Sequence, residues 1–86
     1  MARLMNVGFG NVVNTDRILS IISPDSAPAK RLISRAKEQE TIIDATQGRR
    51  TKSVIITDTG RIILSALLTD TLVGRFQGQN LTAEDM

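Results

Sequence analysis

Residues 53–66 of the chain read SVIITDTGRIILSA, and this stretch decides the fold. Its two apolar runs, Val54–Ile56 and Ile62–Leu64, have the length and the β-branched composition of strands. The Asp58-Thr59-Gly60 segment between them is a tight turn signal, so we expect an antiparallel hairpin. Neither run alternates apolar with polar residues, which is typical of strands covered on both faces.

The segment upstream of this hairpin holds the clearest helix signal in the chain. Ser26 suits the N-cap, and Pro28 falls in the first turn, where its missing N–H costs nothing. Apolar residues then recur at helical spacing, at positions Ala29, Leu32, Ile33 and Ala36. We therefore expect a well-formed helix that ends at about Gln39, with Lys30 and Arg31 off its apolar stripe.

The other elements are shorter. We expect strands over residues 3–7, 17–22 and 41–46, extended structure at 12–13, and a bend at Gly8-Phe9-Gly10-Asn11. A short helix is expected over 70–76, capped by Thr69 and weakened by Gly74. The fold class is then α+β, with a small, mixed, mostly antiparallel curled sheet of about five strands. Residues 1–78 form one domain, and 79–86 a frayed acidic tail.

Size favours self-association. A domain of 86 residues buries only about 60% of the surface that its unfolded chain exposes. One good helix and one poor helix cannot cover both faces of five strands, so burial against copies of the same chain is the simplest remedy. A tightly curled sheet is the alternative. We expect a homo-oligomer.

The missing residue types argue against several function classes. The chain has no His, Cys, Tyr or Trp, which removes the usual ligands of zinc, haem and copper and the commonest general base. Gly8-Phe9-Gly10 begins like a dinucleotide-binding motif, but Val13 stands where the third glycine belongs. We expect no enzyme activity, cofactor, metal or small-molecule substrate. With no membrane-length apolar run and no disulfides, we expect a cytoplasmic protein.

The middle of the chain is locally basic. Between Pro28 and Lys52 there are seven basic residues against three acidic ones, although the net charge is only +2. Gly48-Arg49-Arg50-Thr51-Lys52 is the strongest feature, because the planar forks of adjacent arginines match phosphate oxygens. A solvated turn is the plain alternative. Asp44 and Asp58 flank this turn and could hold a cation, but turn capping and charge pairing explain them better.

Duplex DNA, bound largely through its backbone, suits this residue set best. Single-stranded and RNA-binding modules stack bases on aromatic side chains, and this chain offers only Phe9 and Phe76. Several copies of one basic patch would gain avidity without new contacts. Two alternatives stay open: a structural or partner-binding module whose basic turn docks on an acidic protein, and an RNA-associated factor.

Several separate blocks of the sequence occur in a characteristic order. The blocks are NVGFGN (6–11), SPDSAP (23–28), IDATQGRRT (43–51) and ILSA (63–66). On these blocks the chain resembles the extracellular matrix regulatory protein A (RemA) family of bacterial biofilm regulators, over residues 6–66.

The resemblance implies a fold, an assembly and a set of contacts. It implies a LytTR-like DNA-binding fold in a closed ring of about seven or eight subunits, and activation of matrix genes through repeated upstream sites, in the nucleoid. The family's DNA-contacting arginines correspond to Arg17, Arg49 and Arg50 here, and Arg17 has no other argument in its favour. Beyond what the resemblance implies, four further cations are candidates for auxiliary contacts, although a solvated face is the favoured interpretation of them: Lys52, Lys30, Arg31 and Arg35.

Overall fold

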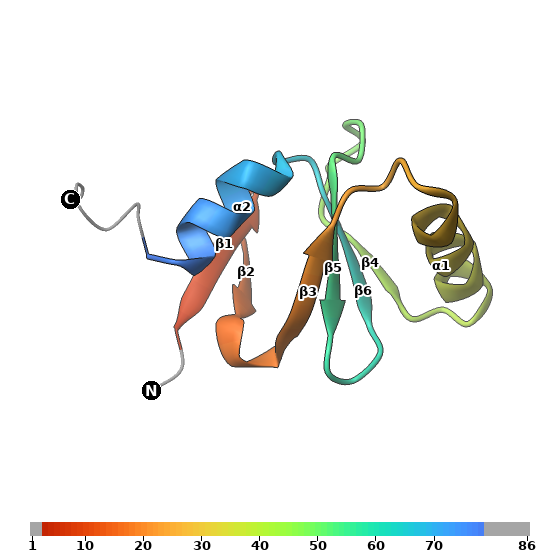
Figure 1. The fold of residues 1–86 in the computed structure, drawn as a ribbon, viewed down its shortest axis with the longest axis horizontal. Coiled ribbons are helices and arrows are strands. Elements are labelled where there is room, and N and C mark those ends of the chain that lie inside the picture. The colour runs from red at the N-terminus through yellow and green to blue at the C-terminus, as the bar shows by residue number, and fades with distance from the viewer. Residues whose placement is uncertain (1–2, 79–86) are drawn as a thin grey trace.

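The computed structural model describes residues 3–78 of the chain. Within that range the chain forms six strands and two α-helices in an α+β arrangement (Figure 1). The strands are β1 (Leu4–Gly8), β2 (Asn11–Asn14), β3 (Ile18–Ile22), β4 (Ile42–Asp44), β5 (Ser53–Thr57) and β6 (Ile62–Ser65). The helices are α1 (Ala27–Glu38) and α2 (Thr69–Phe76), and a 3-10 helix over Thr15–Arg17 precedes β3. The tail expected over residues 79–86 lies outside the described residues.

The strands form two sheets. β1 and β2 make a two-stranded antiparallel hairpin, and the other four strands make a sheet in the order β3-β5-β6-β4. In that sheet β5 pairs antiparallel with β3 and β6, whereas β4 pairs parallel with β6. The mixed, mostly antiparallel character is thus confirmed, and the prediction of a single sheet of about five strands was wrong. The physical reason is that β1 and β2 exchange their ladder bonds with each other and not with the larger sheet.

The four-stranded sheet is the middle of three layers (Figure 1). On one face Ile55 and Ile63 pack against residues of the β1–β2 hairpin and α2, namely Met5, Val7 and Leu72. On the other face, α1 packs its predicted apolar stripe against the sheet. The core on this side contains Ala36 of the helix and Val54, Ile62 and Leu64 of the sheet. Both apolar runs of the 53–66 hairpin are therefore covered on both faces, as their composition predicts.

This coverage corrects one step of the argument for self-association. The sequence-based expectation was that two helices leave the sheet partly bare. The structure instead supplies a third covering element, because the β1–β2 hairpin folds over the same face as α2. Any assembly must then use surfaces other than the two faces of the central sheet.

The first helix begins as predicted and the second does not. The Ser26 hydroxyl accepts the Ala29 N–H at 3.2 Å, and Gln39 is the C-cap of α1. The N-cap of α2 is Leu68, without a side-chain cap, so the assignment of Thr69 as its cap was wrong. Thr69 is the first helical residue, and its hydroxyl lies 3.1 Å from the hydroxyl of buried Ser53. Neither helix within residues 3–78 is long and apolar enough to cross a membrane.

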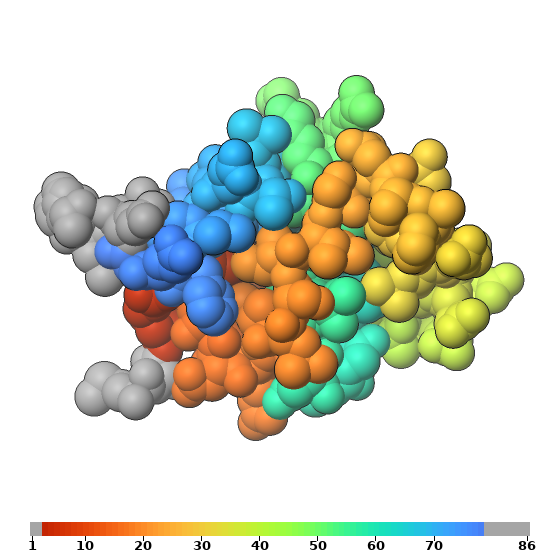
Figure 2. Space-filling view, viewed as in Figure 1, coloured from red at the N-terminus to blue at the C-terminus, as the bar shows by residue number. Residues whose placement is uncertain are grey.

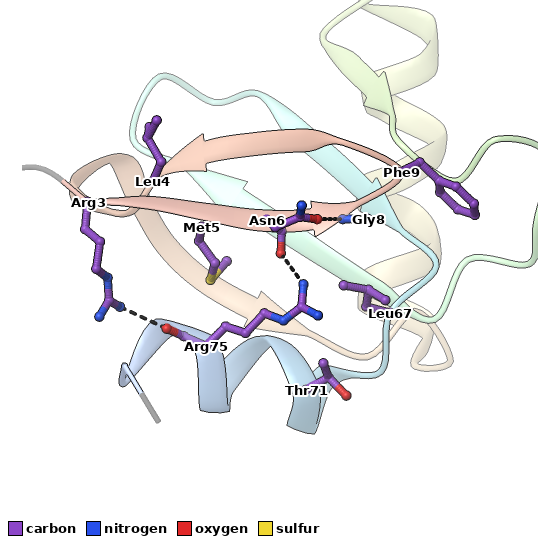
Figure 3. Close-up of a pocket in the computed structure, with 9 residues that line it drawn as sticks. All are labelled: Arg3, Leu4, Met5, Asn6, Gly8, Phe9, Leu67, Thr71 and Arg75. Carbon is purple, nitrogen blue, oxygen red and sulfur yellow. Dashed lines mark hydrogen bonds between the residues drawn. The ribbon is translucent and has the colours of Figure 1, made fainter. Parts of the chain in front are cut away.

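Side chains fasten the β1–β2 hairpin to the rest of the fold. Ser65, fully buried at the end of β6, donates its hydroxyl to the carbonyl of Val7 at 2.7 Å. At the other side Arg75 of α2 donates to the carbonyl of Asn6 at 2.9 Å, and Arg3 donates to the carbonyl of Arg75 (Figure 3). Arg3 also donates to the carbonyl of Phe76. These bonds fix the position of the hairpin relative to β6 and α2.

Candidate functional site

Residues 45–52, which we call the basic loop, connect β4 to β5 and carry Arg49, Arg50 and Lys52. Both ends of the loop are bound to β6. The Ala45 N–H donates to the carbonyl of Leu64 at 2.9 Å, and the Lys52 N–H donates to the carbonyl of Ser65 at 2.8 Å. Because its ends are held by neighbouring carbonyls, the loop projects from one end of the sheet as a fixed structure (Figure 1).

A tight turn sets the direction of the arginines. Gln47 and Gly48 have φ values of 54° and 79°, and the Arg49 N–H donates to the carbonyl of Thr46 at 2.9 Å. Two successive positive φ values are the signature of a type I′ turn, in which glycine carries no steric penalty. The predicted Gln47-Gly48 turn is thus confirmed. Thr46 is buried and residues 47–50 are exposed, so the turn lifts both arginines into solvent.

The cations of the basic loop line a hollow of about 350 Å³. Its walls are Arg49, Arg50 and Lys52 together with Phe9, Ala66 and Leu67. Within residues 3–78 none of the three cations pairs with a carboxylate. The charges and donors of three unpaired cations beside an open hollow are chemically suited to an anion such as phosphate.

Phe9 is the residue of this site that sequence reasoning missed. The sequence indicated only a bend at residues 8–11, and the structure places Phe9 at the tip of the β1–β2 hairpin beside the basic loop. Its side chain is 52% exposed. One feature of the sequence could have pointed to Phe9: a bulky aromatic residue stands between two glycines, at a turn position that aromatic residues rarely occupy.

Arg17 lies apart from the basic loop. It ends the 3-10 helix before β3, and its guanidinium donates to the Asp58 carboxylate at 3.1 Å. Asp58 follows the end of β5 and the basic loop precedes its start, so the two sites are separated by the length of that strand, about 17 Å for five extended residues. Figure 1 shows the 3-10 helix and the basic loop at opposite ends of β5. The structure therefore does not gather Arg17 with Arg49 and Arg50 in one subunit.

The cations of α1 occupy another layer. Lys30, Arg31 and Arg35 are exposed on α1, which covers the face of the central sheet opposite the β1–β2 hairpin. The structure does not bring them into the hollow that Phe9 lines. Of the four auxiliary cations named from the sequence, only Lys52 belongs to the site.

The two carboxylates that flank the basic loop in the sequence serve structural roles. Asp44 accepts the N–H and the hydroxyl of Thr46 at 2.9 and 2.6 Å, and these bonds lower the pKa of its carboxyl, helped weakly by the charge of Lys37. Asp58 pairs with Arg17. Among residues 3–78 no three His, Cys, Asp or Glu side chains could hold a metal ion. Turn capping and charge pairing, the preferred interpretations of these residues, are confirmed.

Replacing Asp44 with alanine is expected to destabilise the start of the basic loop by about 1 kcal/mol, because Thr46 loses its hydrogen-bond acceptor. The folded pKa of Asp44 lies below its usual 3.8, so its contribution is full above that pH and is lost as the pH falls through the folded pKa. The melting temperatures of the parent and D44A should differ at pH 7 and converge in acid. A constant difference down to pH 2 would show that the carboxylate charge has no part in holding the loop.

Comparison of the sequence with known proteins identifies the family of this chain. The sequence profile of the RemA-like family, described as extracellular matrix regulatory protein A-like, matches residues 4–76. A protein of Acaryochloris marina is 49% identical over 82 residues, which cover 95% of this chain and 93% of that protein. A protein of Symbiobacterium thermophilum is 53% identical over 83 residues, covering 96% and 82% of the two chains. Both relatives carry the name "Putative regulatory protein".

Proposed function

This chain belongs to the RemA-like family of extracellular matrix regulatory proteins, and from that premise we propose that it is a transcriptional regulator that binds duplex DNA as a homo-oligomeric ring. Family membership and the names of the relatives support a regulatory role. DNA binding, a LytTR-like fold, a ring of seven or eight copies, a place in the nucleoid of the cytoplasm, and a function without catalysis are parts of the proposal. The anticipated targets are matrix genes.

One observation carries the proposal of DNA binding. Arg49, Arg50 and Lys52 are exposed on a loop fixed at both ends, and no carboxylate within residues 3–78 neutralises them. Ordering these long side chains costs entropy and like charges repel, so the arrangement gives the fold nothing. Phosphates of a duplex would supply the missing counter-charges, in bidentate geometry for the two arginines and as a point-charge contact for Lys52.

The position of Arg17 sets a requirement on the duplex. If Arg17 binds DNA, it does so at a phosphate about 17 Å away from those at the basic loop, or it binds through a neighbouring copy. In either case Asp58 has to release or share the Arg17 guanidinium, since a carboxylate repels phosphate.

The surface for self-association that we favour lies at the edge strand β3. Ile18, Leu19 and Ile21 of β3 line a groove of about 200 Å³ with Val73 and Phe76 of α2. α2 and β3 lie side by side on the face seen in Figure 2. Leu19 is 69% exposed, and β3 has no strand on its outer side within the described residues. An apolar groove beside an open strand edge is suited to a second copy.

A measurement of solution mass with and without DNA tests the proposal directly. Light scattering should give a mass several times the 9.4 kDa of one chain, and a larger mass when a promoter fragment is added. The logarithm of the binding constant should fall linearly and steeply with the logarithm of the salt concentration, because bound cations release counterions. Structured RNA and an acidic protein serve as competitors. A single-chain mass with no binding at low salt would end the proposal, and preference for either competitor would replace DNA as the ligand.

A further inference from the structure

The tip of the β1–β2 hairpin holds a residue that the turn itself does not favour. Phe9 and Gly10 are the two central residues, with φ values of 54° and 79°, and Gly8 pairs with Asn11 across them. This is a type I′ hairpin, whose central positions favour Asn-Gly, Asp-Gly or Gly-Gly. A bulky side chain at positive φ is sterically penalised, so phenylalanine at position 9 strains the backbone.

The strain is not offset by burial. Phe9 belongs to neither core cluster of the described residues, and about half of its side chain faces solvent. Figure 3 shows its ring projecting from the end of the hairpin, away from the other labelled side chains. Phe9 therefore strains the turn and gains little stabilisation from burial in return. Because the residue does not favour folding, we expect its role to lie in a contact outside the fold.

The tip is also held rigidly. The N–H of Gly8 donates to the Asn6 amide oxygen at 2.7 Å (Figure 3), and the carbonyl of Gly8 accepts from the Asn11 side chain at 2.9 Å. Below the tip, the Val7 carbonyl accepts from Ser65, the residue whose own carbonyl anchors Lys52. These bonds hold the backbone of the tip, and with it the Cα of Phe9, in position relative to the basic loop.

We propose that Phe9 is a DNA-contacting residue, whose ring packs against deoxyribose and base edges beside the phosphates held by Arg49 and Arg50. The inference rests on the proposed function and adds a non-ionic contact to it. The hollow combines three cations with one aromatic face, which matches a ligand that carries phosphates next to apolar sugar and base surface. Apolar side chains that proteins place against base steps act in this way.

The test uses substitutions at position 9 in the full chain. Phe9→Asn removes the ring and supplies the residue that the turn prefers, so its melting temperature should rise by about 5 °C. Its affinity for a duplex should fall about tenfold, as expected when the burial of one apolar side chain is lost. The slope of affinity against salt should not change, because no charge is removed. Phe9→Tyr is the matched control and should bind as the parent does.

A second variant reads the contact directly. Phe9→Trp introduces the only tryptophan of a chain that also lacks tyrosine, so its fluorescence reports this position alone. Emission should be quenched when duplex is added, and the quenching should follow the binding curve.

The outcomes separate this inference from the proposed function. If F9N binds duplex as tightly as a parent that itself binds, the role of Phe9 is refuted and DNA binding stands. A change in the solution mass of F9N would also refute it, because the ring would then lie between copies. If the parent binds no duplex at low salt, the proposed function fails and this inference fails with it.

Discussion

Replacing Arg49 and Arg50 together with alanine is expected to lower the affinity for duplex DNA by at least about 100-fold. Two charge-assisted phosphate contacts, each contributing about 1.5 kcal/mol, account for that factor in one subunit. The slope of affinity against salt should become shallower by about 2 for each subunit that touches the duplex, since two fewer phosphates are neutralised. Titration of a labelled promoter fragment at four salt concentrations measures both effects. The solution mass should not change, because neither side chain lies at the groove of β3 and α2 where self-association is proposed.

The matched control removes the same charge elsewhere. Arg31 and Arg35 are also exposed but lie on α1, outside the hollow of the basic loop. The R31A/R35A variant should keep most of the affinity. If the two double variants weaken binding equally, the protein responds to net charge alone and the basic loop is not the binding site.

Replacing Leu19 with glutamate should dissociate the assembly into single chains. Leu19 is the most exposed large apolar residue described on β3, and burying its carboxylate replacement against a second copy would require desolvation of a charge. The mass by light scattering should fall toward 9.4 kDa. DNA affinity should fall by 100-fold or more at physiological salt, because linked copies of one site gain about two to four orders of magnitude in avidity.

The control for this variant introduces the same charge on another surface. Ser34 is exposed on α1, and S34E should keep the parent's mass and affinity. An L19E chain that still assembles would move the interface away from the edge of β3. An L19E chain that is monomeric yet binds DNA as before would show that assembly is not needed for binding.

Local signals made the helices and the central hairpin predictable. The Ser26 cap, the apolar stripe of α1 and the Asp58-Thr59-Gly60 turn each act over a few residues, and each was confirmed. The division into two sheets depends on contacts between distant residues. The Ser65 hydroxyl donates to the carbonyl of Val7, 58 residues away in the sequence, and neither segment alone predicts that bond. The predicted N-cap of α2 was wrong for the same reason, because the Thr69 hydroxyl lies within hydrogen-bond distance of the distant Ser53 hydroxyl and does not cap the helix.

The candidate site was predictable in part. Arg49 and Arg50 stand out in the sequence because two adjacent cations follow a glycine, and the structure leaves both unpaired within the described residues. Arg17 was named as a candidate DNA contact only because of the family resemblance. The resemblance gave no position for it relative to the basic loop, and that position follows from the length of β5. Phe9 was missed because two facts about it are not visible in the sequence. Its φ angle is positive, and it lies beside the basic loop, which is about 40 positions further along the chain.

The attachment of both ends of the basic loop to two consecutive carbonyls of β6 has an evolutionary consequence. Since Leu64 and Ser65 hold the ends, residues 47–51 can be exchanged or lengthened without disturbing the sheet below. Natural selection can then change this segment without altering the scaffold, so any constraint on the sequence of residues 47–51 comes from what they contact and not from the sheet.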